Sequence, residues 1–163
     1  MTYRSGFGYD IHRLTPGRRL MLGGVHIPSP LGLEGHSDAD VLLHAICDAL
    51  LGAAALGDIG MHFPNADPLF KNISSLKLLS MVNDMIINSR FQIVNVDSTV
   101  VLERPRIAEY VPEMQHNISK TLNLPASVVS VKATTNEALG SIGKGEGCAA
   151  FAVTSLCSLD SET

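Results

Sequence analysis

The sequence predicts a single α/β domain of the α+β type, in which helices pack on one face of a mixed β-sheet. Strand-like and helix-like segments interleave along residues 1–163 without a regular β-α-β series. The length suits one domain, because domains cluster around ~100–150 residues. An apolar fraction of 45% and a charged fraction of 17% are typical of a globular protein that buries a core.

Periodicity and turn residues define the expected elements. Alternating β-branched and aromatic residues predict strands, apolar spacings of three and four predict helices, and Gly and Pro clusters predict turns. We expect strands within residues 3–14, 18–27, 91–102, 128–134 and 147–156, helices over about 38–56, 75–88 and 111–122, a loop over 28–35, turns over 58–68 and 140–147, and a frayed tail over 158–163.

The helix expected over residues 38–56 has the strongest signals. Ser37 is its expected N-cap, and Asp40 completes a capping-box pattern. The segment is apolar almost all round, which is typical of a buried helix. However, Asp40, His44 and Asp48 recur every four residues and form one polar stripe. A stripe this narrow favours a bound metal or ligand over simple contact with water.

Composition argues against several partners and locations. The net charge of −4 offers no basic surface to nucleic acid or to an acidic membrane. Cys47, Cys148 and Cys157 lie in or beside apolar segments without a C-x-x-C pair, so we expect buried thiols in a reducing compartment. Because the chain shows neither a signal-peptide pattern nor a membrane-spanning run, we expect a soluble, cytoplasmic protein.

Metal-ligand side chains gather in two segments. Asp10 and His12 are two positions apart on an expected strand, so they share one face, ~6.6 Å apart along it. Such a pair alone is common by chance. His44 on the buried helix would supply a third ligand, and one Asp with two His leaves the open position of a catalytic zinc site. Asp48 is expected to support His44 from behind.

Two further segments suit phosphate. His36 and Ser37 precede the helix, whose free N–H groups favour an anion, although Ser37 alternatively serves as a simple cap. Thr134 and Glu137 match a capping box that opens a short turn, so they also have a purely structural interpretation. A functional interpretation instead gives the hydroxyls of Thr134 and Thr135 to phosphate oxygens and the Glu137 carboxylate to a hard cation such as Mg²⁺.

Together these segments resemble the 2-C-methyl-D-erythritol 2,4-cyclodiphosphate synthase family of the non-mevalonate isoprenoid pathway. The most specific block is S-D-x-D-V-x-x-H over residues 37–44, followed by D-A-L-L-G-A-A-A-L-G-D-I-G over residues 48–60. The other matching segments, in the family's order, are residues 8–12, 63–64, 95–97, 132–135 with Glu137, and 145–147.

The resemblance implies a lyase that catalyses an intramolecular phosphoryl transfer. The 2-phosphate of 4-diphosphocytidyl-2-C-methyl-D-erythritol 2-phosphate attacks the β-phosphorus, CMP leaves, and a cyclic diphosphate remains. One Zn²⁺ per subunit would bind Asp10, His12 and His44, and Mg²⁺ or Mn²⁺ would bind Glu137. His36 and Thr135 would be the catalytic residues that stabilise the transferring group.

The resemblance also implies the substrate contacts. The erythritol part would contact Asp58, Ile59, Gly60, Phe63, Pro64, Asn65, Ala66 and Asp67. The cytidine would lie against Leu102, Glu103, Arg104, Pro105, Arg106, Ile107, Ala108, Ala133 and Thr134. The other implied substrate contacts are Asp10, His12, His36, Ser37, Thr135, Asn136, Glu137, Ser141 and Lys144.

Family members are homotrimers whose sheets face a central axis, with active sites at the subunit interfaces. This resemblance predicts that Thr135 and Glu137 act in a neighbouring subunit's site. Asn65 replaces a common Asp. Ser141, Lys144 and Phe151 depart from the family's usual residues around an axial cavity, and Lys lacks the bidentate fork of Arg, so we expect weak or no binding of isoprenoid diphosphates.

Two other functions share parts of this pattern. A zinc-dependent phosphohydrolase would use the same metal ligands but release a linear product. A non-catalytic module that binds nucleotides or isoprenoid diphosphates would need neither the complete metal set nor Thr135. The presence of all these residues favours the synthase.

Overall fold

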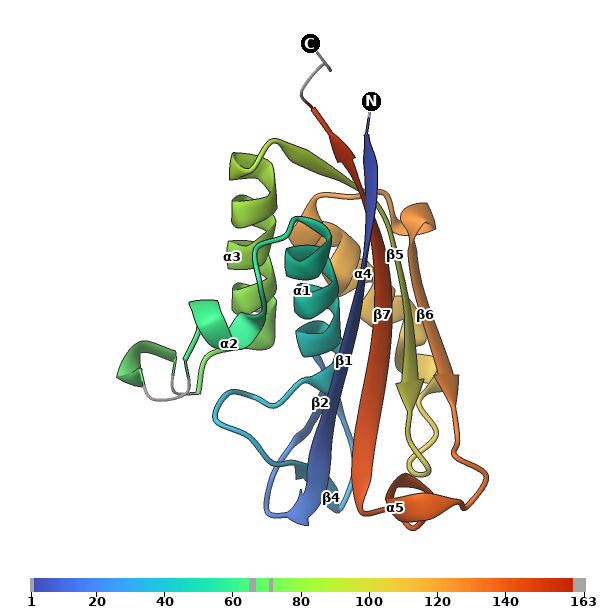
Figure 1. Ribbon diagram of the computed structural model, residues 1–163. Helices are drawn as coiled ribbons and strands as arrows, with labels where there is room; N and C mark the ends of the chain where they lie inside the picture. Colours follow the sequence, from blue (N-terminus) through green and yellow to red (C-terminus); the bar gives the residue numbers. More distant parts are fainter. Residues whose placement is uncertain (1, 65–66, 71, 160–163) are drawn as a thin grey trace.

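The computed structural model describes residues 2–64, 67–70 and 72–159 and has an α+β architecture (Figure 1). Asn65 and Ala66, two of the implied erythritol contacts, lie outside the described residues, as does the tail from residue 160 onward. The elements in chain order are β1 (Tyr3–Pro16), β2 (Leu20–Leu22), β3 (Val25–Ile27), β4 (Leu31–Leu33), α1 (Val41–Ala53), α2 (Ile59–His62), η1 (Pro68–Phe70), α3 (Ser75–Asn88), β5 (Phe91–Val101), η2 (Ala108–Tyr110), α4 (Val111–Leu122), η3 (Ala126–Val128), β6 (Val129–Thr134), α5 (Gly140–Gly143) and β7 (Gly147–Ser158).

The strands form the predicted mixed sheet. Five of them pair in the order β4-β1-β7-β5-β6, and β2 pairs with β3 separately. β5 and β6 are parallel, whereas β1 is antiparallel to β4 and β7, and β7 is antiparallel to β5. α3 contacts both α1 and α4, and these three helices lie on one side of the sheet (Figure 1). The core therefore lies between one sheet face and one helical layer.

The main helix begins later than the sequence predicts. Its N-cap is Asp40, whose carboxylate accepts a hydrogen bond from Leu43 N at 3.1 Å, so the expectation of Ser37 as N-cap is wrong. Ala39 has φ of 57°, a left-handed conformation outside the helical region, which prevents the helix from starting at Asp38. Ser37 instead accepts a hydrogen bond from Ala39 N at 3.1 Å.

Other differences concern short elements and one end. β4 lies in the segment predicted as a loop, and α2 and α5 lie in segments predicted as turns. β7 continues to Ser158, which pairs with Phe91 and so belongs to the sheet rather than to a frayed tail. Cys47, Cys148 and Cys157 are free and buried, as predicted. Among the described residues, no helix combines the length and apolarity that crossing a membrane requires.

Two glycines of β1 allow α1 to lie directly against the strand. A Cβ atom added at Gly8 would lie 1.9 Å from the carbonyl oxygen of Ala45, and one at Gly6 would lie 1.9 Å from that of Ala49. Both distances are far inside van der Waals contact. Any side chain at these positions would therefore push α1 away from β1.

We predict that Gly8→Ala destabilises the protein, because the added methyl group would collide with the backbone of α1. Overpacking of a tight interior typically lowers the free energy of unfolding by about 1–3 kcal/mol. Gly52→Ala is the matched control, since a Cβ there meets no described atom within 4 Å and alanine favours the helix. Urea unfolding compares the variants, and equal stability of the two would contradict the prediction.

Candidate metal centre

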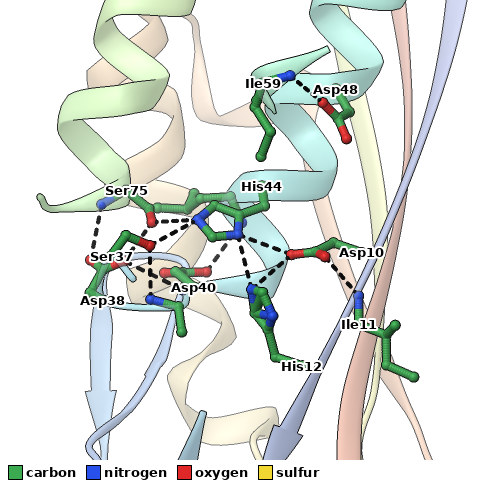
Figure 2. Close-up of polar contacts among 12 residues, drawn as sticks. Asp10, Ile11, His12, Ser37, Asp38, Asp40, His44, Asp48, Ile59 and Ser75 are labelled. Atoms are coloured by element: carbon green, nitrogen blue, oxygen red, sulfur yellow. Dashed lines mark hydrogen bonds and ion pairs between the residues drawn. The ribbon is translucent and has the colours of Figure 1, made fainter. Parts of the chain in front are cut away.

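β1 and α1 bring the three predicted metal ligands together. Asp10 and His12 project from the β1 face that packs against α1, and His44 lies one turn into that helix (Figure 2). Asp10 Oδ2 lies 3.2 Å from His12 Nε2 and 3.0 Å from His44 Nδ1, and the two nitrogens are 3.2 Å apart. The predicted convergence of these side chains is confirmed.

The donor atoms suit a zinc ion in number, type and spacing. Bonds of about 2.0–2.1 Å at tetrahedral angles would place such atoms roughly 3.3 Å apart, close to the observed triangle. Burial lowers the pKa of His12 despite the nearby charge of Asp10, which favours the neutral imidazole that a metal requires. Burial also opposes protonation of His44, but the hydrogen bond and charge of Asp10 outweigh it and raise the pKa. Asp10 thus favours positive charge at His44, whereas burial disfavours it at His12.

A buried relay holds the His44 ring from its other side. His44 Nε2 lies 3.0 Å from Ser75 Oγ and 3.2 Å from Ser37 Oγ. Ser75 Oγ donates in turn to an Asp38 carboxylate oxygen, and Ser75 N donates to the other oxygen at 3.0 Å. Because Ser75 Oγ gives its proton to Asp38, it accepts from His44 Nε2–H, which leaves Nδ1 as the nitrogen that faces Asp10 and would bind a metal. Asp38 and Ser75 therefore fix the tautomer and orientation of His44.

Asp40 and Asp48, the two acidic residues of the predicted polar stripe, both accept hydrogen bonds from backbone N–H groups of neighbouring segments. Asp48 accepts a hydrogen bond from Ile59 N at 2.8 Å, so it holds the start of α2 (Figure 2). The expectation that it supports His44 stays a prediction. Asp40 accepts from Gly23 N at 3.0 Å and from Gly24 N at 2.7 Å, besides capping α1. Burial raises the pKa of Asp40 to about 6, against the effect of these N–H donors.

The predicted polar stripe on α1 is therefore only partly a ligand site. His44 alone of its three residues faces the metal cluster, while Asp40 and Asp48 organise neighbouring segments. The anion expected beside His36 and Ser37, before this helix, stays a prediction. Asp40 accepts the hydrogen bond from Leu43 N, so that donor of the first turn is already engaged, whereas His36 and Ser37 line the same cavity as His44.

The metal cluster opens into a cavity of about 250 Å³. Its walls combine the three metal ligands with several residues implied as substrate contacts, namely His36, Ser37, Ile59, Gly60 and Phe63. Asp58 lies at the edge of this region as the N-cap of α2 and accepts a hydrogen bond from Met61 N at 3.0 Å. Asp67 likewise accepts from Leu69 N at 2.9 Å, a local turn contact.

A second cluster lies beyond the end of β6. Thr135 Oγ1 donates to Glu137 Oε1 at 3.1 Å. A cavity of about 240 Å³ beside it is lined by Thr135 and by most of the implied cytidine contacts, namely Leu102, Glu103, Pro105, Arg106, Ile107, Ala108, Ala133 and Thr134. A larger cleft of about 920 Å³ is lined by three cationic residues, Arg104, Arg106 and Lys144. Ser141 lies on α5 nearby.

The two clusters are far apart within one chain. Thr134 pairs with Val101, Val101 with Ala149, and Ala149 with Ile11, so one row crosses β6, β5, β7 and β1. Three strand spacings of about 4.8 Å separate the ends of this row by roughly 14 Å. The structure therefore does not bring Thr135 and Glu137 to the metal ligands on β1.

Fold and site together define a protein of the α+β class with a candidate three-ligand metal site that opens into a cavity. The model of the YgbB family matches residues 3–157, and the chain belongs to this family. A relative from Syntrophobacter fumaroxidans, named 2-C-methyl-D-erythritol 2,4-cyclodiphosphate synthase, is 58% identical over 150 residues, which cover 92% of this chain and 94% of the relative.

Two solved structures are similar to this chain over nearly its whole length. "IspF (Plasmodium falciparum) CDP complex" is 35% identical with a TM-score of 0.85, and the match covers 97% of each chain. The bifunctional IspDF from Campylobacter jejuni is 42% identical with a TM-score of 0.93, where the match covers 98% of this chain and 43% of that one.

We predict that Ser75→Ala weakens zinc binding roughly tenfold to a hundredfold, the usual cost of losing a group that orients a metal ligand. Ser74→Ala is the matched control, because Ser74 makes no side-chain capping bond in the part of the chain that is described. Competition with a calibrated chelator measures both affinities. Ser75 had no detectable signal in the sequence, since it lies 31 residues from His44.

Proposed function

We propose that this chain converts 4-diphosphocytidyl-2-C-methyl-D-erythritol 2-phosphate to 2-C-methyl-D-erythritol 2,4-cyclodiphosphate and CMP, as a phosphorus–oxygen lyase of the non-mevalonate pathway. The observation that carries the proposal is the Asp10–His12–His44 triangle, which opens into the same cavity as His36 and Ser37. The identity of 58% to a synthase of that name supports it. Three buried free thiols fit a reducing compartment such as the cytoplasm.

The chemistry requires positioning more than proton transfer. The attacking 2-phosphate is already an anion, so no general base is needed. The protein must hold two phosphoryl groups in line and neutralise their charge, and such positioning can reach effective molarities of ~10⁵–10⁸ M. A Zn²⁺ ion on Asp10, His12 and His44 would supply Lewis-acid polarisation of a phosphoryl oxygen.

Other residues of the chain would complete the positioning. His36 and Ser37 line the cavity beside the triangle and would bind the reacting phosphates, His36 stabilising the transferring group. Thr135 would stabilise that group from the other side. Its hydroxyl donates to Glu137, which orients the carboxylate proposed to hold Mg²⁺ or Mn²⁺ on the diphosphate.

A complete site would need a second subunit. The two clusters lie at opposite ends of a sheet row, too far apart to act on one phosphate. The sheet face away from the helices is also strongly apolar: Phe7 is 63% exposed, and Tyr9 and Phe151 are exposed with ring centroids 5.0 Å apart. Exposed patches of this kind are typical of interfaces. We propose that three copies meet through this face, as the family resemblance implies.

Phosphorus NMR of the substrate with zinc- and magnesium-loaded protein tests the activity. We expect the resonances of the cyclic diphosphate and CMP, and no product after zinc is removed, because the metal triangle organises the phosphates. A linear monophosphate would indicate a hydrolase instead. An unchanged substrate with fully loaded protein would indicate a binding module.

Mixing two inactive variants tests the shared site. His44→Ala removes a metal ligand and Glu137→Ala removes the second cluster, so each variant alone should be inactive. Co-assembled 1:1 trimers should recover about a quarter of the activity, because one in four interfaces then joins two intact halves. A mixture that stays inactive, although native mass spectrometry with a mass tag on one variant shows mixed trimers, would place both clusters in one chain.

A further inference from the structure

We propose that Glu103 is a positioning residue that holds the turn of residues 135–138 in its binding shape. Its carboxylate accepts a hydrogen bond from Asn136 N on Oε2 at 3.1 Å and from Ala138 N on Oε1 at 3.2 Å. Both oxygens are thus engaged by backbone donors of the turn that carries Thr135 and Glu137. The inference rests on the proposed function only in assigning that turn to phosphate and metal.

The turn needs such a support because its backbone is strained and exposed. Glu137 and Ala138 are consecutive non-glycine residues with φ of 51° and 59°, in the left-handed region. Residues 135–139 are all exposed within one chain, and besides the contact of Ala138 with Gly143 of α5 little packing fixes their conformation. Asn136 Nδ2 donates to Leu139 O at 2.7 Å, which closes the turn locally but does not attach it to the sheet.

Glu103 provides that attachment. It lies two residues after the end of β5 and next to Leu102, whose N donates to Thr134 O at 3.0 Å. Glu103 also lines the cavity of the implied cytidine contacts together with Thr135. It therefore ties the turn to the segment that frames the nucleoside, so a nucleotide placed by that segment meets Thr135 and Glu137 at a set distance.

This role differs from a direct substrate contact. A carboxylate aimed at a diphosphate would repel it, whereas the Glu103 oxygens are occupied by two N–H donors. Loss of Glu103 should therefore weaken the binding of phosphate groups and of the metal near Glu137. Binding of the nucleoside itself should change little.

Calorimetric titration of zinc-loaded protein with CDP and with CMP, each in Mg²⁺, tests the proposal. We expect Glu103→Ala to weaken CDP binding roughly tenfold to a hundredfold, the usual effect of losing bonds to a charged acceptor. CMP, which has one phosphate fewer for the turn, should lose markedly less affinity. Glu103→Gln keeps one acceptor oxygen and should fall between Glu103→Ala and the unchanged protein.

Glu109→Ala is the matched control, since it removes the same charge from an exposed position in the next short helix, η2. It should leave both affinities unchanged. CDP affinity of Glu103→Ala within twofold of the unchanged protein would overturn the proposal, as would equal losses for CDP and CMP. If Glu103→Ala does not fold, unchanged CDP affinity in Glu103→Gln would overturn it. These binding readouts do not depend on turnover, so they separate this inference from the proposed reaction.

Discussion

The close contact between α1 and β1 is the constraint on which the rest of the structure depends. It exists because Gly6 and Gly8 present no side chains, so the backbone of the helix reaches the backbone of the strand. At that distance, the next two inward residues of β1, Asp10 and His12, meet His44 within hydrogen-bonding range. A wider spacing would separate the strand ligands from the helix ligand and open the metal triangle.

Carboxylates that bind no ligand directly then hold the surroundings of this triangle. Asp38 orients His44 through Ser75, Asp40 ties the β2–β3 hairpin to α1, and Asp48 ties α2 to the same helix. Each uses backbone N–H or hydroxyl donors, which neutralise much of its charge within the protein. Glu103 would serve the second cluster in the same manner. Backbone amides paired with acidic side chains thus build a site for an anionic substrate in a chain of net charge −4.

The sheet face that the helices leave uncovered is the surface through which copies of the chain would associate. β1 alternates between residues that face α1 and residues such as Phe7 and Tyr9 that stay exposed beside Phe151 of β7. One face of β1 therefore supplies two of the three candidate metal ligands, and the other offers an apolar surface. Because the Thr135 cluster lies at the far end of the same sheet, association through the apolar face would bury that face and bring the Thr135 cluster of one copy to the ligand triangle of another.

Local spacing in the sequence was sufficient for the sheet-and-helix architecture and for the candidate metal ligands, because a strand places Asp10 and His12 on one face and apolar residues bury the helix of His44. Only the tertiary structure decided the start of α1, which depends on the left-handed Ala39, and the roles of Asp38, Asp40 and Asp48. Their partners lie on other segments of the chain, 11 to 37 residues away, and no local pattern encodes such distances. The separation of Thr135 from the metal likewise follows from strand order, which is a property of the whole sheet.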